Sequence, residues 1–173
     1  GNPQITFFKV VYRRHTNFSM ETIQQTLSGT PAASGTSTVT ISRNGDLVHK
    51  VYVTSTDTAI TKGSGLCTEV ECEIGGQRID RQYEQWNQIW WELSTPASQW
   101  EGFKYMIGDA SINHNIKGQL LGKVQVPLNF WFCRNPGLAL PLIALQYHEV
   151  KLKLTWSASS FFSTSPEVWC DYL

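Results

Sequence analysis

The sequence is short of charge, and neither sign prevails. Charged residues make up 16% of its 173 residues, and 14 lysines and arginines balance 14 aspartates and glutamates, so the formal net charge is zero. A dedicated DNA-binding domain would carry a basic excess. The balance therefore argues against direct contact with nucleic acid. It also predicts a surface covered in part by uncharged polar and aromatic side chains.

Long apolar runs and paired cysteines are also missing. The longest apolar run, 138–145, is interrupted by Pro141, whereas a membrane-spanning helix needs about 20 residues. No secretory signal is visible. The sequence contains four cysteines, with no C-x-x-C pair among them: Cys67, Cys72, Cys133 and Cys170. This sparse spacing predicts reduced thiols in an intracellular compartment rather than a disulfide framework.

The groups that perform catalysis do not gather in any known pattern. The four histidines are scattered, at His15, His49, His114 and His148. No H-E-x-x-H zinc site, G-x-S-x-G nucleophile turn or phosphate-binding loop is present. The sequence therefore predicts a protein that is not an enzyme, with no catalytic residue, cofactor or metal.

Three glutamates alternate along one predicted strand, at Glu69, Glu71 and Glu73. A calcium or carbohydrate site is one interpretation. Carboxylates in a line do not surround a cation, however. The preferred interpretation is a solvated strand face, or one paired with Lys151 and Lys153 of a neighbouring strand.

Short β-rich segments follow one another along most of the chain. Strands are predicted over the following ranges: 5–14, 38–43, 46–53, 66–74, 123–133 and 147–156. Asn44-Gly45 favours a type I′ hairpin turn, because both central residues need positive φ. Arg43 and Asp46 would then form a cross-strand ion pair. The alternation after Tyr147 predicts a strand with one wet face.

The period changes once, after Gly75-Gly76. The residues Ile79, Tyr83, Trp86, Trp90 and Leu93 recur three and four residues apart, as on one buried face of an α-helix. Asp80 is the predicted N-cap, and Pro96 ends the helix. This inserted helix, about 80–94, is predicted to be the only substantial one.

Many short strands with one inserted helix are typical of an all-β protein with two antiparallel sheets, a β-sandwich or jelly roll. The length favours a single domain over residues 1–173. In a jelly roll the third and fourth strands commonly lie in opposite sheets, which conflicts with a plain hairpin at Asn44-Gly45. Either that turn forms a corner between the sheets, or the strands are numbered differently here.

Seven tryptophans are many for this length. Trp91 falls off the predicted helical stripe, so we expect it to be exposed and to contact a partner. Trp100, just beyond the helix, is the second candidate for a subunit contact. Asn17 begins an Asn-Phe-Ser sequon, a candidate glycosylation site.

Four stretches together resemble one family, the major capsid proteins of nucleocytoplasmic large DNA viruses. They are GNPQITFFKVVYRRHTNF (1–18), ISRNGDLV (41–48), IGGQRID (74–80) and FWFCRNPGLALPLIALQYHEV (130–150). These ordered matches are spread over nearly the whole chain, so the resemblance is specific.

The resemblance implies two jelly rolls in tandem, of which this chain is expected to be the first, with the second absent. Three copies would form a trimeric capsomer of pseudo-hexagonal outline, and capsomers would tile an icosahedral shell. The implied partners are other copies of the chain, minor capsid proteins and an internal membrane beneath the shell. The implied location is the virion, assembled in the host cell cytoplasm.

Two alternatives remain open. The first is a carbohydrate-binding jelly-roll module, with tryptophans as platforms for sugars. The second is a cupin-type enzyme, which would need a metal held by clustered histidines.

Overall fold

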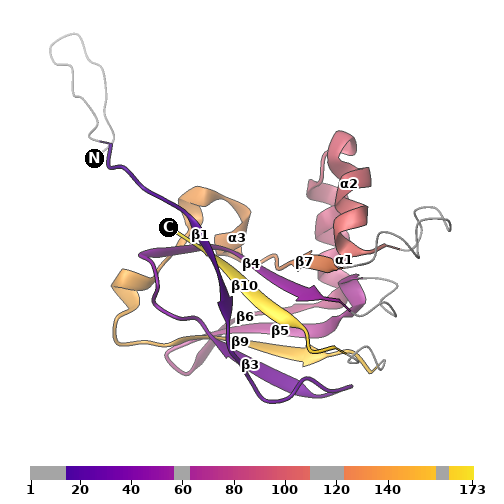
Figure 1. The fold of residues 1–173 in the computed structure, drawn as a ribbon, viewed down its shortest axis with the longest axis horizontal. Helices are drawn as coiled ribbons and strands as arrows, with labels where there is room; N and C mark the ends of the chain where they lie inside the picture. The colour runs from indigo at the N-terminus through magenta and orange to yellow at the C-terminus, as the bar shows by residue number, and fades with distance from the viewer. Residues whose placement is uncertain (1–14, 57–62, 110–122, 159–163) are drawn as a thin grey trace, which may run out of the picture.

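Two antiparallel sheets form the body of the protein (Figure 1). The computed structural model describes residues 15–56, 63–109, 123–158 and 164–173. The first sheet contains, in order, β1 (Glu21–Gln25), β10 (Glu167–Tyr172), β4 (Leu47–Ser55) and β7 (Val124–Pro127), with β8 (Leu140–Pro141) paired to β4. The second contains, in order, β2 (Leu27–Ser28), β3 (Thr36–Thr40), β9 (Val150–Trp156), β5 (Cys67–Ile74) and β6 (Gln77–Tyr83).

The chain crosses repeatedly from one sheet to the other. It passes from β1 to β3, back to β4, on to β5 and β6, back to β7, on to β9, and ends in β10. This alternation between two sheets is the topology of a jelly roll. The predicted all-β sandwich of two antiparallel sheets is confirmed.

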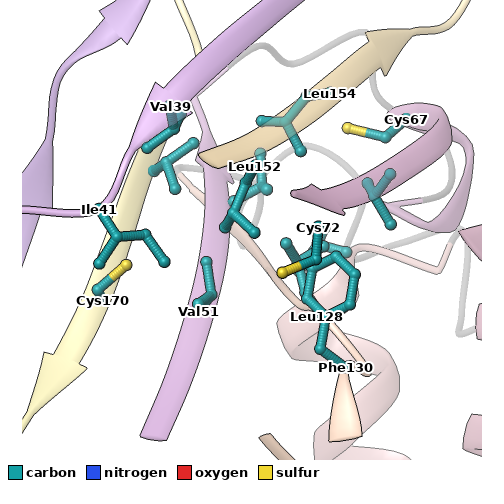
Figure 2. Packing of buried hydrophobic residues seen from close by; sticks show 14 of the residues in the cluster. Val39, Ile41, Val51, Cys67, Cys72, Leu128, Phe130, Leu152, Leu154 and Cys170 are labelled. Atoms are coloured by element: carbon teal, nitrogen blue, oxygen red, sulfur yellow. The ribbon is translucent and has the colours of Figure 1, made fainter. Parts of the chain in front are cut away.

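A single apolar core fills the space between the sheets. In β9 buried and half-buried residues alternate without a break, as the sequence predicts for a strand with one wet face. Figure 2 shows Leu152 and Val39 of the second sheet with Val51 and Cys170 of the first. Burying a side chain of this size contributes about 1.5–3 kcal/mol. Packing of the two inner faces therefore holds the sandwich together.

The predicted hairpin at Asn44-Gly45 is wrong. The strand before it, β3, lies in the second sheet, and the strand after it, β4, lies in the first. Neither turn residue adopts positive φ. Arg43 does not pair with Asp46 but donates hydrogen bonds from Nη2 to the carbonyl oxygens of Leu145 and His148, at 2.8 and 3.2 Å. The turn is a corner between sheets, the first of the two alternatives.

The prediction of one helix over 80–94 is wrong in two respects: the helix begins later, at Glu84, and a second helix follows it. Residues up to Tyr83 belong to β6, which pairs with β5 after a tight turn at Gly75 and Gly76, both with positive φ. Asp80 therefore lies in a strand and caps nothing. The ladder of β5 continues into β6 because the two glycines permit a hairpin where the apolar spacing favours a helix.

Two helices, rather than one, are inserted between β6 and β7. They are α1 (Glu84–Ser94) and α2 (Ala97–Ile107), which stand together at one side of the sandwich (Figure 1). Pro96 ends α1 as predicted, but it also precedes the first turn of α2, where a missing N–H costs nothing. Gly108 ends α2 in the left-handed conformation, at φ 69°.

The strand predicted over 123–133 is shorter than expected. It ends at Pro127, and the chain then forms a short helix, α3 (Trp131–Arg134). Short 3-10 turns occur elsewhere, at η1 (Gly63–Gly65), η2 (Pro136–Leu138) and η3 (Leu142–Leu145). The strand predicted over 5–14 lies outside the described residues.

Candidate functional site

The structure brings no metal-binding or catalytic cluster together in the part of the chain it describes. Among those residues, no group of three or more His, Cys, Asp or Glu side chains could hold a metal ion. His49 is buried, and its Nδ1 lies 3.2 Å from the carbonyl oxygen of Phe132. His15 and His148 are exposed, and His114 lies outside the described ranges. Of the histidines that can be placed, one is therefore buried against a backbone carbonyl group and two lie on the surface.

The four cysteines are free thiols: Cys67, Cys72 and Cys170 are buried on strands of the sandwich, and Cys133 on α3 packs partly buried against the core. Burial is the main cause that raises the pKa of Cys67, Cys72 and Cys133 to about 12. It also raises the pKa of Cys170. A nucleophilic cysteine needs a lowered pKa and access to solvent. These thiols therefore act as small apolar core residues.

Two of the three glutamates of β5, Glu69 and Glu71, pair with basic side chains of their own sheet. Arg81 Nε lies 2.7 Å from Glu69 Oε1, and Arg78 Nη1 lies 3.3 Å from Glu71 Oε1. The hydrogen bond from Arg81 is the largest cause that lowers the pKa of Glu69. Lys153 is 4.0 Å from Glu71. The preferred interpretation, a paired strand face, is confirmed, although arginines of β6 supply most of the pairs.

The expectation that Trp91 is exposed is wrong. Its side chain is only 4% exposed. Its Nε1 donates to Asn129 Oδ1 at 3.2 Å, and Asn129 Nδ2 donates to Asn87 Oδ1 at 2.8 Å. Gln82 Nε2 donates to the Asn129 carbonyl oxygen at 3.0 Å. The indole turns inward because this polar network satisfies its N–H in the interior. Trp91 thereby fixes α1 on the sandwich.

Trp100 lies close to Trp91, as a half-buried ring on α2. It stacks on Phe103 at 6.0 Å, Phe103 packs edge-on against Trp91 at 5.3 Å, and Lys104 lies over Trp100 at 5.3 Å. Both tryptophans line a pocket of about 150 Å³ between the helices. The polar residues lining it are Ser64, Gln88, Glu92 and Asp109. The structure therefore brings the two predicted contact residues together, while their contact with another subunit stays a prediction.

The end of α2 is fixed by a close approach of backbone to backbone. A side chain at Gly63 would meet the carbonyl oxygen of Ile107. This close approach sets α2 against β7 and η1, while the buried network at Trp91 joins α1 to the sandwich. The insertion is thus a fixed projection of the sandwich.

The outer side of α1 carries features that the sequence reasoning missed. Trp86 and Trp90 stack at 5.7 Å, and the Arg134 guanidinium lies 4.3 Å from the centre of the Trp90 ring. Ile89 and Leu93 on the same side are 51% and 77% exposed. The apolar spacing of this stripe predicts a side that meets the core. In the structure Trp90 packs partly against the core, while Leu93 of the same stripe is exposed. In the sequence, only Asn87 and Trp91, which do not belong to this stripe, could have indicated which side of α1 is buried.

Two further predictions concern the surface. Asn17 is exposed in the segment before β1, and its glycosylation stays a prediction. None of the helices in the described ranges has the length and apolarity that a membrane span requires.

Comparison of sequences identifies relatives along nearly the whole chain. A family model described as "Major capsid protein N-terminus" matches residues 6–170. The major capsid protein of Pyramimonas orientalis virus is 53% identical over 92% of this chain and 43% of that protein. The major capsid protein of Paramecium bursaria Chlorella virus 1 is 40% identical over 100% of this chain and 44% of that protein. The chain spans less than half the length of these relatives.

Comparison with solved structures also finds viral capsid proteins. A chain of the PBCV-1 virus capsid matches with a TM-score of 0.76 at 38% identity, over 96% of this chain and 45% of that one. The Faustovirus major capsid protein matches with a TM-score of 0.69 at 11% identity, over 98% of this chain and 56% of that one. At that identity the Faustovirus likeness concerns the fold alone.

Proposed function

This chain belongs to the family of major capsid proteins of large DNA viruses, at the N-terminal part of those proteins, and on that premise we propose that it is the first jelly roll of a shell subunit. The observation that carries the proposal is the match to a chain of the PBCV-1 virus capsid, at 38% identity over 96% of this chain. The matched relatives are more than twice as long, which supports a second domain of similar size in the whole protein.

The proposed role is to hold a shape beside identical neighbours. Two interlocked sheets make a stiff block, since protein interiors pack as densely as organic crystals. Three such subunits form a capsomer, and capsomers tile the shell. Each contact can be weak, because a closed symmetric assembly repeats it many times. The zero net charge allows many copies to pack without strong mutual repulsion.

The helical insertion is the part of the block proposed to reach a neighbour. Trp100 is half-buried on α2 and accessible to another subunit. Trp91 supports the same pocket from within, through its hydrogen bond to Asn129. A subunit contact here is therefore made by Trp100 directly, while Trp91 positions the helix beneath it.

The remaining parts of the proposal come from the family resemblance. They are contacts with minor capsid proteins, an internal membrane beneath the shell, assembly in the host cell cytoplasm, and the absence of enzymatic activity. The neutral charge balance supports the further proposal that the chain does not contact nucleic acid directly.

The carbohydrate-binding alternative is less well supported. Sugar platforms are exposed aromatic faces, and the best ring pair here is Trp86 with Trp90. The Arg134 guanidinium lies over both rings, at 6.0 and 4.3 Å. The side of the pair that Arg134 covers is therefore closed to a sugar ring. A glycan array probed with the purified chain is expected to give no specific signal.

Particle composition tests the proposed function. In purified virions of the virus that encodes this chain, mass spectrometry should find its peptides among the most abundant proteins. An antibody against the chain should label the shell in electron micrographs. Particles in which the polypeptide is absent or scarce would overturn the assignment.

A further inference from the structure

A small pocket lies between the two inserted helices and the turn η1. Its volume is about 150 Å³, and residues of η1, α1 and α2 contribute to its lining. The lining combines aromatic rings, carboxylates and uncharged polar groups. We propose that the pocket binds a small organic cation, a protonated alkylamine. Binding of such a ligand goes beyond the proposed role in a shell and does not depend on it.

The charged side chains of the described chain that line the pocket are both acidic. They are Glu92 on α1 and Asp109 just after α2. Among the described residues, no ion pair engages Glu92, whose side chain is exposed to solvent. Opposite charges attract and like charges repel, most strongly where a low-dielectric wall lies beside them. Charge therefore selects cations over anions at this pocket.

Two tryptophan rings contribute to the lining, Trp91 from α1 and Trp100 from α2. The face of an indole ring attracts cations more strongly than the other aromatic side chains do. The Trp100 ring already attracts one, because Lys104 Nζ lies 5.3 Å from its centre. A metal ion such as calcium would instead need six or more oxygen ligands, and the described residues contain no group of three or more acidic, histidine or cysteine side chains that could hold one. The aromatic lining therefore favours an organic cation.

A buried hydroxyl group in the lining has hydrogen-bonding capacity to spare. Ser64 is only 6% exposed, and its hydroxyl oxygen accepts from Gln88 Nε2 at 3.4 Å, its single side-chain bond among the described residues. Gln88 Nε2 also donates to Glu84 Oε1 at 3.2 Å, which leaves Gln88 Oε1 as an acceptor. Buried polar groups normally have their hydrogen-bonding capacity filled. The N–H donors of an ammonium group fill it here, at the oxygens of Ser64 and Gln88.

The volume of the pocket limits the size of the ligand. A protein cavity of about 150 Å³ is known to hold benzene, a molecule of about six non-hydrogen atoms. Pentylammonium has the same number of non-hydrogen atoms. Ile107, which is 5% exposed, and the Trp91 ring supply the apolar wall for its alkyl chain. The pocket therefore accommodates a short alkylamine as a whole, or one end of a longer polyamine.

The walls of the pocket are held in place without a ligand. α1 and α2 stand side by side (Figure 1), and Phe103 packs edge-on against Trp91 at 5.3 Å. Trp91 is tied to the sandwich by its bond to Asn129 Oδ1 at 3.2 Å. The close approach of Gly63 to the Ile107 carbonyl oxygen sets η1 against the end of α2. A site that is already formed loses little conformational entropy when a ligand enters it.

Isothermal titration calorimetry of the purified chain with pentylammonium chloride tests the proposal. One ion should bind per chain. 1-Pentanol, which has a similar shape without the charge, should bind at least about tenfold more weakly. In two-dimensional nitrogen–proton nuclear magnetic resonance spectra, pentylammonium should shift the indole N–H signals of Trp91 and Trp100. Equal affinity for the alcohol and the ammonium ion would overturn the proposal, as would displacement of pentylammonium by an equal concentration of magnesium chloride.

Three variants locate the site. The double variant Glu92→Gln, Asp109→Asn and the single variant Trp100→Leu should each weaken pentylammonium binding at least about tenfold. The control Glu101→Gln removes a carboxylate of α2 that does not line the pocket, and it should bind like the unmodified chain. Far-ultraviolet circular dichroism shows which variants are folded, and if one pocket variant unfolds, the other decides.

A folded pocket variant that binds pentylammonium as tightly as Glu101→Gln does would overturn the assignment of the site. The result is independent of the test in virions. A chain that is abundant in virions but does not bind pentylammonium contradicts this site alone, whereas a chain that binds it but is absent from virions contradicts the proposed function alone.

Discussion

The sandwich and the helical insertion treat their outer surfaces in opposite ways. On the outside of the second sheet, charges meet partners in the same sheet, as Arg81 meets Glu69 at 2.7 Å. On the outside of α1, apolar side chains such as Leu93 remain exposed. The second sheet therefore neutralises charges on its outer side within one copy, while the insertion exposes apolar side chains on its outer side.

Their interiors differ as well. The sandwich is held by apolar packing, with Leu152 and Phe130 fully buried. The insertion is held to it by side-chain hydrogen bonds that centre on Asn129. Apolar packing is less directional than hydrogen bonding, whereas a buried, fully satisfied polar network favours one geometry. Apolar packing in the sandwich therefore supplies most of the stability, and the polar network sets the direction of the helices.

Raising the pH should have the largest effect, because it acts on several buried groups of the sandwich at once. Burial raises the pKa of Cys67, Cys72 and Cys133 to about 12, whereas an unfolded thiol titrates near about 8.5. The pKa of each thiol is higher in the folded chain than in the unfolded chain. The neutral thiols therefore contribute fully to the free energy of unfolding below about pH 8.5, and this contribution is lost as the pH rises through about 12. The melting temperature should fall throughout that interval in thermal melts.

A matched variant separates thiol ionisation from general alkaline damage. The chain with Cys67→Ala and Cys72→Ala should melt at a lower temperature at neutral pH, but its melting temperature should fall less steeply between those pH limits. Equal slopes for both chains would contradict the role assigned to the thiols.

Leu152→Ala should have the next largest effect. The side chain lies at the centre of β9 with no exposed surface, so its removal leaves a cavity between the sheets. We expect a loss of about 2–5 kcal/mol in the free energy of unfolding, measured by urea denaturation. The neighbouring Lys153→Ala points outward and should cost much less. If the two cost the same, the core does not lie where we describe it.

Asn129→Ala should have an intermediate effect that is concentrated in the insertion. It removes the acceptor of Trp91 Nε1 and the donor to Asn87. Buried polar groups left without partners cost about 1–3 kcal/mol. Hydrogen exchange should show α1 opening before β9 does. Asn44→Ala, which removes an exposed bond to Ser42, is the control, and uniform loss of protection would show that α1 and the sandwich unfold as one unit.

Glu69→Gln should have the smallest effect, because its partner lies in solvent. Pairing with Arg81 lowers the pKa of Glu69, so its contribution is present at neutral pH and is lost as the pH falls below about 4. We expect a loss of about 0.2–1 kcal/mol at pH 7, reduced by high salt. In 1 M salt the Debye length is about 3 Å, so an exposed ion pair is largely screened. If Glu69→Gln still lowers the free energy of unfolding in 1 M salt, the Glu69 side chain has a buried role instead.

Local pattern predicted much of the sandwich. The alternation in β9 and the run before Gly75 specified strands whose inward and outward residues were read correctly. A two-residue period places side chains on two faces whatever the strand pairs with. The hairpin at Asn44-Gly45 failed because turn preference acts on a few residues, while the choice between sheets depends on partners far along the chain.

The candidate site was predicted less well, for a related reason. Trp100 and Trp91 were singled out, and they do line one pocket, but the predicted stripe of α1 meets the core only in part, at Trp90. Apolar spacing tells which residues share a helix face, without telling whether that face meets the core or another molecule. Arg134 could not be connected with Trp90 at all, because β7 and α3 bring the two together only in the folded chain.

The class of fold, the absence of a charge bias and the kinship with capsid proteins follow from the residues alone, since composition, period and identity are local properties that add along the chain. The tertiary structure decided that Asn44-Gly45 is a corner, that Trp91 is an anchor, and that part of the apolar stripe of α1 is exposed. Each of these depends on which distant groups satisfy a buried hydrogen bond or fill a cavity, and such partners exist only once the chain has folded.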